Sequence, residues 1–235
     1  MEQLPPARAK SVVRELGWCD GGLYLVSRML ERVTQGRVRL LKYYFVAQPV
    51  RLRPSAASGE RDNLVIVKVD ATHPIVLRLP RPPEVIQKRF RDGAHCFVAL
   101  RAEEFAGFLW LQHGRYDEDE VRCIYYPLPA DRAVWDYDVY VDPGFRLTRT
   151  FMRLWDAAHG YLSGEGYRWT MSRISAFNKH SLSSHQRLGA VFLGSGLFLV
   201  IARVQVSFFT ALPFVHVSLG GNSAPELKLR VSGGG

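Results

Sequence analysis

The sequence contains few cysteines, and those present do not form a metal-binding or disulfide pattern. Cys19, Cys96 and Cys123 lie far apart, and no two of them have the C-x-x-C spacing. Zinc knuckles need such pairs, and disulfide frameworks need a denser set of cysteines. We therefore expect neither, and we expect a reducing compartment, the cytoplasm, as the location.

Long apolar runs are also missing. The longest, from Val191 to Ala202, is interrupted by a Gly-Ser-Gly tripeptide at 194–196 and is too short to cross a bilayer as a helix. The first ten residues contain no apolar stretch behind their basic side chains, as a secretory signal would. These absences predict a soluble protein without a membrane span.

What the sequence does contain is a core-forming composition with an excess of positive charge. Of its 235 residues, 47% are hydrophobic and 23% are charged, which is typical of a packed protein with one elaborated domain or two small ones. Lys and Arg number 31 against 22 Asp and Glu, for a formal charge of +9. Such a surface attracts anions, so phosphate-bearing ligands, acidic proteins and nucleic acid all remain open.

Hydrophobic periodicity predicts an α+β (mixed α/β) fold. Spacings of three and four residues indicate helices, and alternation or short apolar runs indicate strands. The predicted helices are 19–35, 83–91, 147–162 and 181–188, and the predicted strands are 38–46, 64–69, 73–79, 95–100, 105–112, 121–128, 134–141, 168–175, 190–193 and 197–206. We expect a largely antiparallel mixed sheet with helices on both faces. The strand at 134–141, the helix after it and the strand at 168–175 form one parallel βαβ crossover.

The junction between the 134–141 strand and the next helix is the strongest candidate for an anion site. Its sequence from Val139 to Arg146 is VYVDPGFR, and Thr148, Arg149 and Thr150 follow. Free N–H groups at a helix N-terminus, with guanidinium and hydroxyl groups beside them, suit a pyrophosphate. The alternative is a capped helix with ordinary surface arginines.

Two motifs resemble those of the GNAT superfamily of acyl-coenzyme A N-acyltransferases, over about residues 38–206. VYVDPGFR is similar to the V-x-P-x-x-R/Q lead into the family's pyrophosphate-binding turn. The stretch from Asn178 and Ser181 to Leu188-Gly189-Ala190 is similar to N-x-x-A-x-x-x-Y-x-x-x-G-F near the family's next helix. The resemblance implies a domain at 37–206, a helical extension at 1–36 and a tail at 207–235 with a mobile end.

The resemblance also implies an activity and a set of site residues. It implies transfer of an acyl group from acetyl-CoA or a longer acyl-CoA to a small-molecule amine by direct attack, with no metal. The residues that would bind the donor are Val139, Val141, Arg146, Leu147, Thr148, Arg149, Thr150, Asn178 and Ser181. Backbone N–H groups at Tyr140 or its neighbours would hold the acyl oxygen.

The sequence departs from the family at two places. Arg149 and Phe151 stand where the family's turn has small residues, which favours the alternative of an acyl carrier protein as donor, as in N-acyl amino acid synthases of similar type. His185 stands where the family has the tyrosine that protonates the leaving thiolate; a histidine can deliver that proton. His180 is five residues away, on another helical face, so a two-histidine metal site is not expected.

The amine must lose a proton during the reaction, and the 134–141 strand carries two candidate acceptors. Alternation places Asp136, Asp138 and Tyr140 on one face of this strand and Tyr137 and Val139 on the other. Asp136 or Asp138 can accept the proton directly or through water; the alternative is that both face solvent. The acidic run 117–120 is interpreted as a solvated turn that can also attract a cationic amine.

A non-enzymatic binding module is the competing hypothesis. It would be either a degenerate acyltransferase fold that senses an acyl ligand or a basic nucleic-acid binder. The arginines are scattered and no known nucleic-acid reader motif is present, so nucleic acid is the weaker alternative. The acceptor amine, the acyl length and the oligomeric state do not follow from the sequence.

Overall fold

The computed structural model describes residues 6–51, 63–221 and 223–231. The first five residues, part of the segment without signal character, and 232–235, the expected mobile end, lie outside the described residues. The chain divides into two compact units, described separately below. The first unit comprises Met1–Gln48, Asp117–Tyr126 and Ser172–Gly235, and the second comprises Pro49–Tyr116 and Pro127–Met171.

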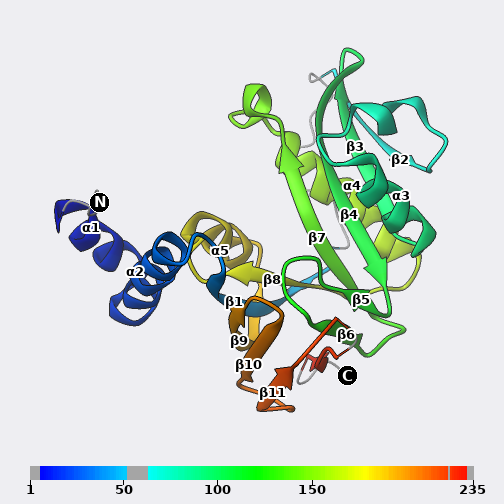
Figure 1. Cartoon of the computed structure of the whole chain (residues 1–235). Coiled ribbons are helices and arrows are strands. Elements are labelled where there is room, and N and C mark those ends of the chain that lie inside the picture. Colours follow the sequence, from blue (N-terminus) through cyan, green and yellow to red (C-terminus); the bar gives the residue numbers. More distant parts are fainter. Residues whose placement is uncertain (1–5, 52–62, 222, 232–235) are drawn as a thin grey trace. The chain divides into compact units, whose positions relative to one another are not determined.

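Helices and strands follow one another in the mixed order expected (Figure 1). The helices are α1 (Pro6–Leu16), α2 (Trp18–Val33), α3 (Pro83–Arg91), α4 (Thr150–Gly164) and α5 (Lys179–Arg187), with 3₁₀ turns η1 (Pro74–Arg78) and η2 (Pro143–Phe145). The strands are β1 (Val38–Pro49), β2 (Leu64–Val69), β3 (His95–Arg101), β4 (Glu104–His113), β5 (Tyr116–Asp117), β6 (Ile124–Leu128), β7 (Ala133–Val141), β8 (Trp169–Ser175), β9 (Val191–Ile201), β10 (Val204–Phe209), β11 (Val215–Ser218) and β12 (Glu226–Arg230).

The second unit is built on strands in the order β8-β7-β4-β3-β2. Neighbouring strands are antiparallel except β7 and β8, which pair in parallel from Ala133 with Trp169 to Trp135 with Met171. Helix α4 connects these two strands, so they form the expected βαβ crossover. The predicted fold class, a largely antiparallel mixed sheet with one parallel crossover, is confirmed.

Two apolar layers cover the two faces of this sheet. Leu109 and Leu111 of β4 pack with Leu154 and Trp155 of α4. Phe108 and Trp110, which alternate with them along β4, pack on the other face against a cluster that includes Ile86 of α3. All four β4 residues have no exposed surface. Strand alternation therefore places a helix on each face, as predicted.

A β-bulge interrupts β7 in the middle. The register with β4 pairs Phe108 with Tyr140 and Trp110 with Tyr137, so Leu109 alone lies opposite Asp138 and Val139. Asp138 has a φ of 49°, the left-handed conformation that L-residues seldom adopt. A bulge of this kind inserts one extra residue and reverses the alternation beyond it.

The expected sharing of one face by Asp136, Asp138 and Tyr140 is therefore wrong. Asp136 pairs with Leu111 on the α4 face, whereas Tyr137 and Tyr140 both pack on the α3 face. Val139 and Val141 remain together, on the α4 face. The physical reason is the extra residue at Asp138, which the period of two cannot reveal.

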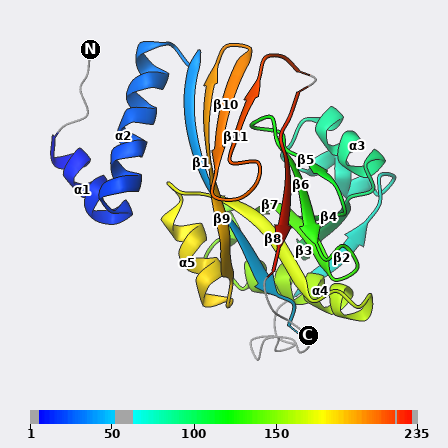
Figure 2. The same cartoon turned by 90° about the horizontal axis from the view of Figure 1, so that it is seen from below.

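The first unit contains strands in the order β11-β10-β9-β1-β8 and a small sheet of order β12-β6-β5. Helix α2 begins near β1, where Ser27 Oγ donates to Leu40 O at 2.7 Å and Asp20 Oδ1 accepts from Lys42 Nζ at 2.6 Å. Figure 2 shows α2 beside β1 and the hairpin β9-β10 on the other side of β1. Within the expected tail, β11 and β12 are regular strands.

Three predicted elements differ in detail. The segment 73–79 is not a strand but the turn η1, because Pro74 cannot donate to a ladder and His73 Nδ1 accepts the Ile75 N–H at 3.2 Å. The strands predicted at 190–193 and 197–206 are one strand, β9, followed by β10. Gly194 lies inside β9 and does not break it. A Cβ on Gly194 would lie 2.6 Å from Thr210 Oγ1, so the glycine allows the Thr210 side chain to approach the strand closely.

No helix of the described residues is long and apolar enough to span a bilayer, as the sequence predicts.

A substitution at Gly107 tests how closely β4 approaches β7, the bulged strand. A Cβ on Gly107 would lie 2.5 Å from Tyr140 O, so we expect Gly107→Ala to lower the free energy of unfolding by about 2 kcal/mol. Gly160, in α4, has nothing within 4 Å of such a Cβ. Gly160→Ala should raise stability by about 0.8 kcal/mol through helix propensity. Urea unfolding of both variants checks this, and an unchanged midpoint for Gly107→Ala would contradict the close approach.

Candidate functional site

The junction from β7 to α4 begins with an Asx turn. Asp142 Oδ1 accepts the Gly144 N–H at 2.9 Å, and Asp142 O accepts the Phe145 N–H at 2.8 Å. Thr148 then donates both its N–H and its hydroxyl to Phe145 O, at 3.0 and 2.7 Å. Because these bonds extend the turn, α4 starts at Thr150 and not at 147, where the apolar pattern begins.

The first turn of α4 has no carboxylate of its own to offset the positive end of the helix dipole. Its N-cap, Arg149, makes no side-chain cap hydrogen bond, and no acidic residue occurs in the turn. Arg146 and Arg149 are exposed beside it, and Leu147 is fully exposed. This end of α4 is therefore cationic, which suits an anionic ligand.

The two threonines of the junction are less accessible than expected. Thr150 has no exposed surface, and its Oγ1 lies 2.8 Å from that of Thr148. The Thr150 N–H also donates to Thr148 Oγ1 at 3.3 Å. These hydroxyls stabilise the turn internally, which leaves guanidinium and backbone groups as the accessible donors.

Phe151 does not fill the turn. Its ring packs against the α4 core cluster and lies 6.4 Å from the Trp155 ring, between centroids. Val139, Val141 and Phe145 pack on the same cluster. Phe151, the bulky residue at a position where the GNAT turn has a small one, therefore points toward the core and not into the turn.

Asp138, at the bulge, is held by two arginines. Arg81 binds it through two nitrogens: Nε donates to Oδ2 at 2.9 Å and Nη2 donates to Oδ1. Arg89 Nη1 donates to Oδ2 at 2.6 Å. Arg89 is 9% exposed; burial by itself lowers the pKa of Arg89, but its bond to Asp138 outweighs this and raises it. Asp138 and its two arginines form what we call the bulge clamp.

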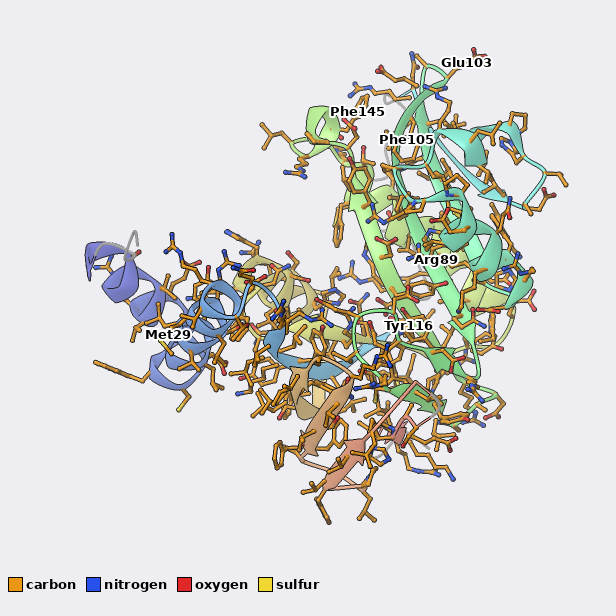
Figure 3. The ribbon with its side chains drawn as sticks, in the orientation of Figure 1. Met29, Arg89, Glu103, Phe105, Tyr116 and Phe145 are labelled. Atoms are coloured by element: carbon orange, nitrogen blue, oxygen red, sulfur yellow. The ribbon has the colours of Figure 1, made fainter. Side chains whose placement is uncertain are left out.

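Aromatic rings support the clamp from the sheet. The Arg81 guanidinium lies 5.2 Å from the centre of the Phe108 ring and 5.5 Å from that of Tyr140. Arg89 lies 5.2 Å from Trp110 and 5.0 Å from Tyr137. These are cation–π distances, and desolvated contacts of this kind contribute about 1–2 kcal/mol each. Figure 3 shows Arg89 on α3 over the sheet. Phe105 lies near the start of β4, and Tyr116, the first residue of β5, follows shortly after the end of β4.

Sequence reasoning missed both arginines of the clamp. Arg89 is three residues after the buried Ile86, so it lies on the buried face of α3. A charged residue at a core-facing helical position is a signal for a buried ion pair, and it was available in the sequence. Arg81 lies between two prolines and gives no such signal.

The second proton acceptor considered, Asp136, lies on the other face of the sheet. It is 2% exposed and pairs with Leu111 in the ladder. The two aspartates are thus not interchangeable. Asp138 is held in an ion-pair network at the bulge, whereas Asp136 is a buried carboxylate two residues earlier in the strand.

Asn178, Ser181 and His185 belong to the first unit. Asn178 Oδ1 accepts the Ser181 N–H at 3.0 Å and so caps α5. His185 is 7% exposed, and desolvation lowers its pKa to about 4. The imidazole is therefore neutral near pH 7, and a neutral imidazole is a much weaker acid than an imidazolium.

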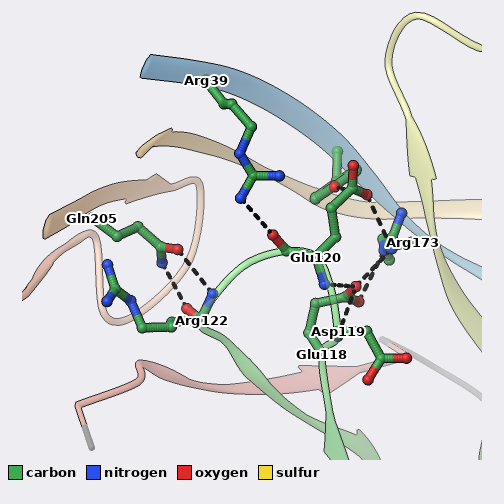
Figure 4. A network of polar contacts seen from close by, with 8 residues as sticks. Arg39, Glu118, Asp119, Glu120, Arg122, Arg173 and Gln205 are labelled. Atoms are coloured by element: carbon green, nitrogen blue, oxygen red, sulfur yellow. Dashed lines mark hydrogen bonds and ion pairs between the residues drawn. The ribbon is translucent and has the colours of Figure 1, made fainter. Parts of the chain in front are cut away.

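The acidic run 117–120 is exposed at three of its residues, as expected, but not at Glu118. Glu118, with its side chain fully buried, accepts two hydrogen bonds from Arg173, at 2.9 and 2.6 Å, and Tyr43 donates to Glu120 (Figure 4). Arg173 also stacks 4.3 Å from the Tyr43 ring centre. Glu118 was misread because its ion-pair partner is more than 50 residues away in the sequence.

A metal centre is not indicated. Within the described ranges, no group of three or more His, Cys, Asp or Glu side chains is placed to hold an ion. His95 and His113 stack with ring centroids 4.8 Å apart, and Tyr161 completes this aromatic contact rather than a ligand set.

Comparisons with known proteins place acetyltransferases among the similar structures. No protein-family model and no curated protein matches the chain. A conserved Staphylococcus epidermidis protein of unknown function is 11% identical with a TM-score of 0.46, over 72% of this chain and 64% of that one. A putative GNAT-family acetyltransferase from Novosphingobium aromaticivorans is 14% identical with a TM-score of 0.48, over 67% and 62%.

A GNAT-family acetyltransferase from Elizabethkingia anophelis, with acetyl-CoA bound, is 16% identical with a TM-score of 0.40, over 54% of this chain and 75% of that one. The chain thus spans less than two thirds of the length of the first two structures.

The bulge clamp can be tested by two substitutions at one position. Asp138→Ala leaves Arg89 buried without its carboxylate, so we expect a loss of about 3 kcal/mol in the free energy of unfolding. Asp138→Gly loses the same bonds but relieves the positive φ, so its loss should be about 1 kcal/mol smaller. Asp92→Ala, which removes an exposed pair with Lys88, is the control and should cost under about 0.5 kcal/mol. Equal losses of unfolding free energy for Asp138→Ala and Asp138→Gly would contradict the backbone strain inferred from the positive φ of Asp138.

The buried His185 predicts acid lability. Its folded pKa of about 4 lies below the usual 6.5, so below pH 6.5 the unfolded chain binds a proton that the folded chain does not. Stability is therefore complete above pH 6.5 and falls as the pH decreases toward 4. We expect His185→Gln to remove this residue's share of the dependence, while His95 and His159, whose pKa values desolvation also lowers to about 4, keep theirs; His180→Gln, an exposed neighbour, should leave it unchanged. Urea unfolding at pH 5 and pH 7 measures both, and identical pH dependences for the wild type and His185→Gln would disprove the assignment.

Proposed function

We propose that the chain is an N-acyltransferase that moves an acyl group from acetyl-CoA or a longer acyl-CoA to a small-molecule amine. The observation that carries the proposal is the β7–α4 junction: a bulged strand leads into a helix whose cationic first turn has Arg146 and Arg149 exposed beside it. A diphosphate is the anion that best matches several backbone donors and two guanidinium groups together.

In this proposal the donor lies along the end of β7. The diphosphate binds at the turn formed by Arg146, Leu147, Thr148, Arg149 and Thr150, chiefly through the two guanidinium groups, since the N–H groups of Thr148 and Thr150 donate within the turn. The pantetheine arm runs along Val139 and Val141, and backbone N–H groups at Tyr140 or its neighbours hold the acyl oxygen. The buried Thr150 hydroxyl and the half-buried Thr148 hydroxyl support the turn rather than contact the ligand.

The transfer itself needs a proton acceptor and a proton donor. The amine nitrogen attacks the thioester carbonyl, the C–N bond forms, the C–S bond breaks, and the amine proton is removed. Asp138 has both oxygens engaged by guanidinium donors, so we assign it to holding the bulge and assign proton acceptance to Asp136, directly or through water. Protonation of the leaving thiolate by His185, and donor contacts of Asn178 and Ser181, stay predictions from the sequence.

An acyl carrier protein as donor is the second form of the proposal. It shares the thioester chemistry but needs only a single phosphate at the end of its prosthetic arm. Binding that depends on the diphosphate therefore distinguishes the two donors, because only CoA carries it.

The activity is tested by thiol release. The purified chain is incubated with acetyl-CoA or longer acyl-CoA and a panel of primary amines; we expect free thiol to appear only when an amine is present. Titration calorimetry should show saturable CoA binding. Arg146→Ala should weaken CoA binding about tenfold, which corresponds to about 1.4 kcal/mol, and leave 4′-phosphopantetheine binding unchanged.

Arg91→Ala is the matched control, since Arg91 is an exposed arginine of the same unit outside the junction. Absence of saturable CoA binding, together with no amine-dependent thiol release, would overturn the acyl-CoA proposal. Turnover with an acyl carrier protein alone would establish the second form.

A further inference from the structure

The first unit carries a sheet face that is apolar across three strands. The register pairs Val206 with Leu199 and Val217, and Phe208 with Leu197 and Val215, so these side chains lie on one face. We call the set the open apolar face. It consists of Leu197, Leu199 and Ile201 of β9, Val204, Val206 and Phe208 of β10, and Val215 and Val217 of β11.

The opposite face of the same strands is already the buried one. Gln205, Ser207 and Phe209 of β10 are 1%, 0% and 7% exposed, and Phe198 of β9 has no exposed surface. An antiparallel sheet that packs one face on a core normally presents polar side chains on the other. Here the eight positions of the open apolar face are Leu, Ile, Val or Phe, which indicates a second covered face.

The face is nevertheless accessible in the single chain. Ile201, Phe208, Val215 and Val217 are 46%, 44%, 56% and 49% exposed. Leu219, the next alternate position after Val217, is 75% exposed. A residue of these types exposes about 200 Å² when fully accessible, so the five leave roughly 500 Å², and the partly buried members add to this. That lies in the upper part of the range for the largest apolar patch of an ordinary monomer, about 300–600 Å², and such patches are often functional.

Helix α2 forms hydrogen bonds with this sheet at β1. Ser27 bonds to Leu40 O, and Asp20 binds Lys42 and Tyr44, which occupy the same face of the sheet as Leu197 and Ser195. The helix itself leaves Met29 57% exposed (Figure 3). The helix is thus bonded to β1, whereas Ile201, Phe208, Val215 and Val217 of the other strands stay between 44% and 56% exposed.

The chemistry of the face favours a second copy of this chain as its occupant. None of its eight members is charged or polar, whereas an anionic lipid surface or an acidic partner would be recognised by basic residues within the patch. The exposed arginines nearby, Arg37 and Arg203, flank the strand ends, which gives an apolar centre with a polar rim. Flat strand faces of this kind pack on each other as the two sheets of a sandwich do, about 10 Å apart.

We propose that two copies of the chain associate through the open apolar face, related by a two-fold axis. The accessible area, roughly 500 Å² for the five residues and more with the partly buried members, approaches what one partner of a standard interface buries, about 800 Å². A two-fold interface uses the same patch on both copies, which a uniformly apolar face permits without charge matching.

The full chain, of 26.7 kDa, is examined by sedimentation equilibrium and by light scattering after gel filtration, from 1 to 100 µM. We expect twice the chain mass for the wild type. Val217→Glu places two carboxylates in the interface and should raise the dimer dissociation constant at least 100-fold. Leu77→Glu, at an isolated residue of the other unit that is 89% exposed, is the control and should remain dimeric.

A second measurement needs no variant: the urea midpoint of a dimer rises with protein concentration, and that of a monomer does not. A wild type that is monomeric at 100 µM with a concentration-independent midpoint would overturn the proposal. So would a dimer that Val217→Glu leaves intact, or a monomer that cosediments with phosphatidylserine vesicles, which would assign the face to a membrane surface.

Discussion

The geometry of the second unit depends on a single ion-paired carboxylate. Asp138 takes a left-handed conformation in the middle of β7, a strained state for a residue with a Cβ. Two guanidinium groups bind its oxygens, and one of them, on Arg89, is almost fully buried. The strain and the ion pairs belong together, because the bulge turns the carboxylate toward α3 and the arginines hold it there.

The bulge then decides which side chains meet which helix. It places Tyr137 and Tyr140 on the α3 face, where they stack with the clamp arginines, and keeps Val139 and Val141 on the α4 core. It also brings Tyr140 O so close to β4 that only a glycine fits at 107. The end of β7 that enters the cationic junction is therefore positioned by contacts on both faces of the sheet.

Each unit uses one buried arginine–carboxylate pair, and neither pair is explained by stability alone. Arg173 with Glu118 in the first unit, and Arg89 with Asp138 in the second, connect segments distant in sequence. A buried pair roughly balances its desolvation cost, yet loss of one partner is expensive. We interpret both as devices that select one arrangement of loops and strands. Other basic side chains lie at the surface, among them Arg146 and Arg149 at the junction before α4.

The sequence by itself determined most of the elements and their order, because periodicity and turn residues are local properties; it missed α1, β11 and β12 and assigned η1 as a strand. It predicted the βαβ crossover and a helix on each face of the sheet, both confirmed, whereas anion binding at the junction after Val141 stays a prediction. Tertiary structure alone decided the roles of individual residues. The faces of Asp136 and Asp138 depend on one inserted residue, the burial of Glu118 depends on Arg173 far along the chain, and the protonation of His185 depends on desolvation. Each is set by neighbours brought together only when the chain folds, and no local pattern records them.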